Sequence, residues 1–209
     1  MENKEIQQIK MVVMKYSNIF SIIISFIIFL IFFALYFDSN FFLYSINRLA
    51  AITGLALISL SLLLSPLSRL FFTYSFLVVL RKPIGLIGFA FIFVHFFISF
   101  LFIFGGDIAN IFKSPKQLVV SLGFLAFVIF LLMAITSTKK AVELLTYEKW
   151  KLLHRFGYIA LFLALLHFIF MRTNPITGLQ IHFLGYVVIF IALLALLLRI
   201  YEQFIKKSK

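Results

Sequence analysis

The sequence predicts an all-α integral membrane protein, a bundle of six transmembrane helices with both termini in the cytoplasm. Two observations predict the fold class. Of the 209 residues, 64% are hydrophobic and only 12% are charged, and the mean hydropathy is +1.14; soluble domains are far less apolar. The apolar residues also fall into runs of about 20, the length at which a helix crosses the hydrocarbon core of a bilayer.

Six apolar runs define the predicted spans. The first follows MENKEIQQIKMVVMK and has no small-residue cleavage site, so we expect a retained span and not a signal peptide. The shorter apolar stretch between Arg69 and Lys82 is expected to lie in the membrane interface. No repeat, nucleotide-binding motif or soluble domain is visible, and residues 1–209 are expected to form a single domain. The six spans are Tyr16–Phe37, Tyr44–Leu64, Ile84–Phe104, Gln117–Thr136, Trp150–Met171 and Ile181–Arg199.

The 19 lysines and arginines are distributed unevenly between the two sides of the predicted membrane. With the N-terminus inside, only Arg48, Lys113, Lys116 and Arg172 fall outside, and the other 15 fall on the cytoplasmic side. This bias follows the positive-inside rule. The net charge of +12 is therefore attributed to membrane topology and not to nucleic acid. Cysteine is absent, which excludes disulfides, iron–sulfur clusters and c-type haem attachment.

Histidines are the chemically informative residues of the spans. No Asp or Glu lies in the six runs, which disfavours a proton pump or transporter, whereas His95 lies in the third span and His154 and His167 lie in the fifth. A helical rise of about 1.5 Å per residue places His95 roughly 20 Å, His167 roughly 25 Å and His154 about 6 Å from the cytoplasmic ends of their spans. Since two axial ligands of one iron lie at nearly equal depth, His95 and His167 are predicted to clasp a b-type haem.

His154 has no histidine at matching depth on the third span, so its role stays open. It could ligate a second haem opposite a group other than histidine, contact a flavin, or lie at the interface. Arg155 could pair with a propionate or phosphate, and Arg48 could meet haem propionates or snorkel toward water. Each histidine could instead only join helices by hydrogen bonds. His182, at the start of the sixth span, is expected to be interfacial, and no catalytic acid–base group is predicted.

Several motifs give the chain a family resemblance. AITST (Ala134–Thr138), the basic loop after it, WKLLHRFGY (Trp150–Tyr158) and the LLH that ends at His167 resemble the ferric-reductase-like transmembrane superfamily. The single histidine of the third span follows RKPIGL, and SPLSR (Ser65–Arg69) and Arg48 also fall where comparable residues are found in one branch of it. That branch comprises the haem-binding subunits of protein-methionine-sulfoxide reductase systems, the MsrQ type.

The resemblance implies a six-helix bundle of the bacterial inner membrane that binds b-type haem, one or two, through His95, His154 and His167, and that can also carry FMN. It implies a cytoplasmic flavin reductase or quinol as electron donor, and as acceptor a periplasmic, MsrP-like molybdopterin reductase that repairs oxidised methionine. The chain would then be an electron-transfer subunit without a substrate-converting site of its own. The fourth span begins with KSPKQ (Lys113–Gln117), where the family has an Arg-Pro-Tyr-like start. The alternatives are a ferric or cupric metalloreductase and a non-redox membrane scaffold.

Overall fold

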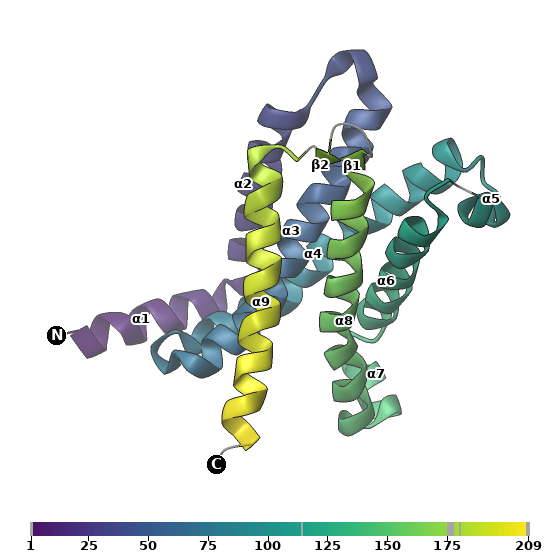
Figure 1. The fold of residues 1–209 in the computed structure, drawn as a ribbon. Coiled ribbons are helices and arrows are strands. Elements are labelled where there is room, and N and C mark those ends of the chain that lie inside the picture. Colours follow the sequence, from purple (N-terminus) through teal and green to yellow (C-terminus); the bar gives the residue numbers. More distant parts are fainter. Residues whose placement is uncertain (1, 114, 175–177, 180, 208–209) are drawn as a thin grey trace.

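The computed structural model describes residues 2–113, 115–174, 178–179 and 181–207, and these are almost entirely helical (Figure 1). Ser114 and Lys209, which belong to the predicted start of the fourth span and to the predicted charge bias, lie outside the described residues. In chain order the elements are α1 (Glu2–Lys15), α2 (Ser17–Tyr36), η1 (Ser39–Phe41), α3 (Phe42–Leu70), η2 (Phe72–Leu80), α4 (Arg81–Ile98), η3 (Ser99–Ile103), α5 (Ile108–Lys113), α6 (Gln117–Ile135), α7 (Lys139–Leu145), α8 (Tyr147–Met171), β1 (Thr173–Asn174), β2 (Gly178–Leu179) and α9 (Phe183–Lys207).

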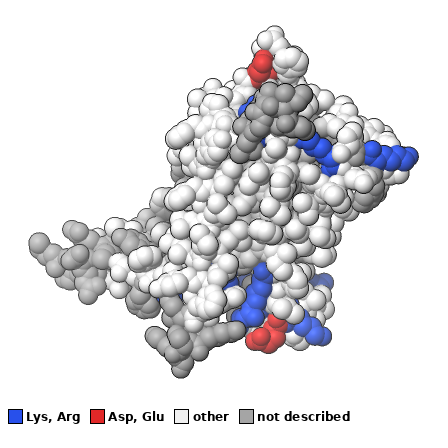
Figure 2. Space-filling model, viewed as in Figure 1, with Lys and Arg blue, Asp and Glu red and all other residues white. Residues whose placement is uncertain are grey.

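Six helical segments of the described chain are long and apolar enough to cross a membrane, which confirms the predicted fold class. Large apolar side chains on them, such as Phe26, Phe93 and Phe190, are exposed, as expected for surfaces that meet lipid and not water. On the face drawn in Figure 2, a broad belt without Lys, Arg, Asp or Glu separates charged groups at the two ends of the molecule. The six segments are Ser17–Tyr36, Ser39–Leu70, Ser75–Ile103, Gln117–Ile135, Tyr147–Met171 and Phe183–Phe204.

Helix α3 is the centre of the bundle. In its apolar window 89% of the residues are buried, against 22% or less in the other five spans. It lies so close to α4 that a Cβ added at Gly88 would be 2.9 Å from the Cβ of Leu57 and 3.1 Å from the backbone nitrogen of Ile58; such backbone approach needs a small residue. Because α3 also packs against α8 and α9, it is the common support for the two histidine-bearing helices, α4 and α8.

The stretch after α3 differs from the prediction. Helix α3 continues to Leu70, and the 3₁₀ helix η2 runs directly into α4 at Arg81. The segment predicted to be a separate interfacial piece is therefore largely the start of the third span, Ser75–Ile103. The basic pair Arg81–Lys82 suggested a break between segments, but both residues lie within the helix and line a cavity inside the bundle.

The sixth span is longer than predicted and buries a carboxylate. Helix α9 extends to Lys207 instead of ending near Arg199, and Glu202 on it is only 4% exposed. The six predicted runs contain no Asp or Glu, but the longer helices of the structure add Glu202 to α9 and Glu148 to α8. Glu202 is ion-paired with both Arg69 and Arg199, and such pairing is what permits a carboxylate to be buried.

Candidate functional site

Two cavities open between the helices, one toward each end of the bundle. The upper cavity, nearer β1 and β2 in Figure 1, has a volume of about 240 Å³ and is lined by His95 of α4 and His167 of α8. The lower cavity, nearer α7, has a volume of about 630 Å³ and is lined by His154 of α8. The structure thus brings His95 and His167 together and places His154 apart from them.

The imidazole rings of His95 and His167 lie next to each other in the upper cavity. Their centroids are 6.5 Å apart, and their planes meet at 60°. Two imidazoles bound to one metal ion from opposite sides, with metal–nitrogen bonds of about 2.0 Å and about 1.1 Å from nitrogen to ring centre, would hold their centroids roughly 6.2 Å apart. The spacing of the two rings therefore fits a single metal ion between them.

A backbone carbonyl of α6 fixes the ring of His167. The imidazole Nδ1 of His167 lies 2.8 Å from the carbonyl oxygen of Val119. Because a carbonyl can only accept, Nδ1 carries the proton and donates it, and the lone pair is left on Nε2. Gly123, one turn further along α6, leaves room for the ring, since a Cβ there would lie 2.6 Å from the same Nδ1 atom.

Asn47 of α3 fixes the ring of His95 in the same way. The imidazole Nδ1 lies 2.8 Å from Oδ1 of Asn47 and 3.2 Å from its backbone carbonyl oxygen, both of which accept. The amide Nδ2 of Asn47 donates to Oγ of Ser99 at 3.0 Å, which orients Oδ1 toward His95. Ser99 opens the π-helical turn η3, a distortion that often occurs at functional sites. Both histidines therefore hold Nε2 unprotonated, the form that ligates metal.

Two arginines also line the upper cavity. The guanidinium of Arg48 lies over the ring of Tyr36, with 4.5 Å between its central carbon and the ring centre, and Arg172 follows directly after α8. Burial lowers the pKa of Arg172, and the positive charge of Arg48 lowers it further. None of the described residues that line this cavity is acidic. The pair fits two carboxylates such as haem propionates; the sequence pointed to Arg48 but gave no signal for Arg172 beyond its charge.

The lower cavity is strongly basic. Arg155, the predicted partner of an anionic group, lies at its edge with an exposed side chain. The described lining includes no acidic residue. A cavity with this charge favours an anionic occupant. Its cationic lining residues are Arg69, Arg81, Lys82, Lys139, Lys151, Arg155 and Arg199.

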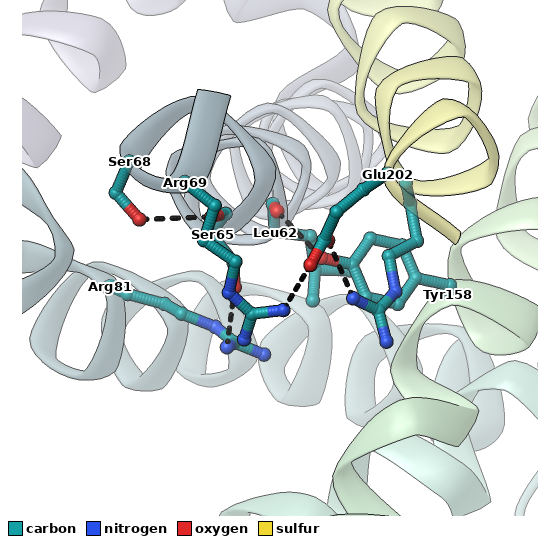
Figure 3. Close-up of polar contacts among 8 residues, drawn as sticks. Leu62, Ser65, Ser68, Arg69, Arg81, Tyr158 and Glu202 are labelled. Carbon is teal, nitrogen blue, oxygen red and sulfur yellow. Dashed lines mark hydrogen bonds and ion pairs between the residues drawn. The ribbon is translucent and has the colours of Figure 1, made fainter. Parts of the chain in front are cut away.

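An ion-pair network lies beside the lower cavity (Figure 3). Glu202 of α9 accepts hydrogen bonds from Arg69 of α3 and from Nη1 of Arg199, the latter at 2.7 Å. Arg81 of α4 points to the same region and donates from Nη1 to Oγ of Ser65 at 3.2 Å. Two arginines thus share the single carboxylate among the residues drawn, and Arg81 adds a third positive charge nearby, so the group keeps an excess of positive charge.

The other two histidines lie in different surroundings. His154 packs on Trp150, with 4.3 Å between ring centroids, and its Nε2 lies 3.4 Å from Oγ1 of Thr136. It is the only histidine among the described lining residues of the lower cavity, in agreement with its lack of a depth-matched partner. His182 is exposed and packs on Tyr36 with 4.8 Å between ring centroids, and it lines neither cavity.

Comparison with known proteins gives the family. The model of the ferric reductase like transmembrane component family matches residues 50–165, which include most of α3, all of α4 and α6 and most of α8. The chain belongs to this family. The expected resemblance to the ferric-reductase-like superfamily is thereby confirmed; the matched residues include His95 and His154, and His167 lies two residues beyond their end.

Within this ferric-reductase-like group, the chain is similar to several proteins named protein-methionine-sulfoxide reductase heme-binding subunit MsrQ. It is 33% identical over 116 residues to the one from Herminiimonas arsenicoxydans (55% of this chain, 53% of that protein). Over 115 residues it is 35% identical to the one from Ralstonia nicotianae (54% and 52%), and over 131 residues 30% identical to the one from Agrobacterium fabrum (61% and 58%). The chain spans about half the length of these curated relatives.

Proposed function

We propose that this protein is a b-haem electron-transfer subunit of the bacterial inner membrane, with His95 and His167 as the axial ligands of one haem iron. The adjacent imidazoles carry the proposal, because each is held in the Nδ1–H form and their spacing suits one iron. A haem bound there supplies reversible one-electron chemistry, with a potential set by its ligands and its burial. The chain itself holds the ring nitrogens in place and surrounds the site with apolar side chains.

Arg48 and Arg172 would hold the haem propionates at the upper end of the cavity. Two guanidinium groups without an acidic residue in the described lining are well suited to two carboxylates, and charge-assisted hydrogen bonds are about twice as strong as neutral ones. The cations would also anchor the haem against rotation in its pocket. The relatives' names, which state that MsrQ proteins bind heme, support this assignment.

Residues 1–209 would form one domain with both termini in the cytoplasm, as the positive-inside bias predicts. Electrons would then enter from a cytoplasmic flavin reductase or quinol and leave to a periplasmic, MsrP-like molybdopterin reductase. The names of the similar proteins, which refer to protein-methionine-sulfoxide reductase, support the acceptor. The transfer would link reducing power inside the cell to the repair of oxidised methionine outside.

The lower cavity would hold a second prosthetic group that carries an anion. Its basic lining suits the phosphate of FMN or the propionates of a second haem, with Arg81 and Arg155 as candidate partners. His154 faces no second histidine among the lining residues that the structure describes. A second haem there would therefore need a different sixth ligand or an open position, whereas FMN would need no axial ligand.

A metalloreductase is the second candidate, favoured by the ferric reductase description of the family. Reduction of ferric citrate and cupric ions by inverted and right-side-out vesicles separates the two functions. A dedicated subunit reduces neither at a rate comparable to electron delivery to its protein acceptor.

Absorption spectra of purified histidine variants test the proposal. The wild-type protein should show Soret and α-bands that change on reduction with dithionite, and His95→Ala and His167→Ala should each abolish the same haem signal. His154→Ala should leave that signal largely intact, and His182→Ala, at the exposed ring, serves as matched control. A wild-type protein without any haem bands would refute the haem proposal and favour a non-redox membrane scaffold. Loss of all haem in His154→Ala with His95→Ala unchanged would refute the assigned ligand pair.

A further inference from the structure

Lys116, in the KSPKQ sequence at the predicted start of the fourth span, lies directly before α6 and reaches the end of α8. Its ammonium Nζ donates to the carbonyl oxygens of Phe170, Met171 and Thr173 at 3.2, 3.3 and 3.0 Å. Phe170 and Met171 are the last two residues of α8, where helices leave carbonyl groups without intrahelical partners, and Thr173 opens β1 two residues further on. A lysine there satisfies them and complements the negative end of the helix dipole. Lys116 therefore caps the helix that carries His167.

The same face of α6 contacts the imidazole itself. Val119 lies three residues after Lys116, and Gly123 lies seven residues after it, which is the spacing of one helix face. The Val119 carbonyl accepts from Nδ1 of His167 at 2.8 Å. Gly123 permits the contact, since a Cβ would lie 2.6 Å from that nitrogen and 2.8 Å from two ring carbons. His167 lies about one turn before Phe170 and Met171, so Lys116 and the first turns of α6 hold both the ring of His167 and the end of its helix.

We propose that Lys116 and Gly123 are positioning residues for His167: Lys116, directly before α6, and the face of α6 formed by Val119 and Gly123 together set the depth and the plane of this imidazole. The inference rests on the proposed function, in which His167 ligates the haem iron. Groups that orient a metal-bound histidine set its ring plane and its basicity. The chain directly before α6 thus has a structural role, because its Lys116 supplies the cap of α8.

Variants at Lys116 test the cap. Lys116→Met keeps the approximate length of the side chain but removes its charge and its hydrogen-bond donors. Lys116→Arg keeps the charge and the donors. Lys113→Met, at an exposed side chain three residues away, is the matched control. Titration of the apo-protein with hemin should show about 10-fold weaker binding in Lys116→Met, with wild-type binding in Lys116→Arg and Lys113→Met. In the same apo-protein, hydrogen exchange at the end of α8 should rise only in Lys116→Met.

The spectrum of the ferric haem tests the ring plane. The highest g value in electron paramagnetic resonance of a low-spin ferric haem follows the angle between its two imidazole planes, which is 60° between the rings of His95 and His167. Gly123→Ala forces His167 or α6 to move, and both it and Lys116→Met should shift this g value and the midpoint potential. A purely structural role would change stability and leave both unchanged in the haem that remains bound.

The outcomes separate this inference from the proposed function. A wild-type protein without haem, or with haem that survives His167→Ala, refutes the proposed function. A wild-type haem that needs His95 and His167, together with wild-type hemin affinity, g value and potential in Lys116→Met, overturns the positioning role. If Gly123→Ala does not yield helical protein in detergent, Lys116→Met and its rescue by Lys116→Arg decide the matter.

Discussion

Glu202→Gln is the sharpest test of the ion-pair network beside the lower cavity. The substitution keeps the size of the side chain and removes the negative charge that Arg69 and Arg199 share (Figure 3). The side chain of Glu202 is 5% exposed and that of Arg199 is 14% exposed, so the loss of the carboxylate leaves a cation in poorly solvated surroundings. Breaking a buried ion pair by removal of one partner costs about 3–5 kcal/mol.

The two arginines should contribute unequally. Arg69 is 48% exposed, and an exposed pair is worth at most about 1 kcal/mol. We therefore expect Glu202→Gln and Arg199→Gln each to lower the free energy of unfolding by about 3 kcal/mol, and Arg69→Gln by less than about 1 kcal/mol. The double variant Glu202→Gln/Arg199→Gln should cost clearly less than the sum, because Glu202→Gln leaves Arg199 without its carboxylate and Arg199→Gln leaves Glu202 with only the more exposed Arg69.

Equilibrium unfolding by sodium dodecyl sulfate in mixed micelles, followed by circular dichroism, measures these differences. Lys140→Gln, an exposed charge in α7 at the same end of the bundle, is the matched control and should be neutral. Two results contradict the reasoning: Arg69→Gln as costly as Arg199→Gln, or Glu202→Gln within about 0.5 kcal/mol of wild type, the range of ordinary surface changes.

Three further changes give distinct results. Asn47→Ala removes the 2.8 Å acceptor of His95 but leaves the backbone carbonyl at 3.2 Å, so hemin titration should show affinity about 10-fold weaker and not abolished; complete loss of binding, or no change, is the contrary outcome. Arg48→Gln/Arg172→Gln should speed transfer of haem to apomyoglobin, with Lys113→Gln as control, and an unchanged rate argues against propionate contacts. Gly88→Val, at the closest approach of α3 and α4, should destabilise the protein by about 1–3 kcal/mol in the same detergent assay, whereas wild-type stability would show that the helices separate freely.

Depth along a helix could be predicted from the sequence, because the rise per residue is nearly constant. Counting residues from the charged ends of the third and fifth spans was sufficient to pair His95 with His167 and to separate His154, and the two rings are indeed adjacent. The six spans could also be predicted, because a span is recognised by the length and the apolar composition of a run of residues, and both can be read from the sequence. What hydropathy misplaced were helix ends marked by basic residues, at Arg81 and Arg199, where the chain continues as helix.

Contacts between helices could not be predicted in this way. The roles of Asn47, Val119 and Gly123 depend on how α3 and α6 are rotated and shifted against α4 and α8, and no pattern in a single sequence fixes those quantities. Val119 acts through its backbone carbonyl, which any residue type at this position would supply, so the sequence carries no signal for it. Glu202 was missed because it follows Arg199, where hydropathy falls. Its burial is visible only once Arg69 is brought beside α9.

Electron paramagnetic resonance of the purified ferric protein, compared with His95→Ala and His167→Ala, tests the central claim most directly. If His95 and His167 clasp one haem, the wild type shows a low-spin signal of two axial imidazoles, and each variant loses that signal. Binding of free imidazole in the place of the missing ring should restore it in part. A high-spin haem in the wild type, or a low-spin signal that survives either substitution, would contradict the ligand pair on which the proposed electron transfer depends.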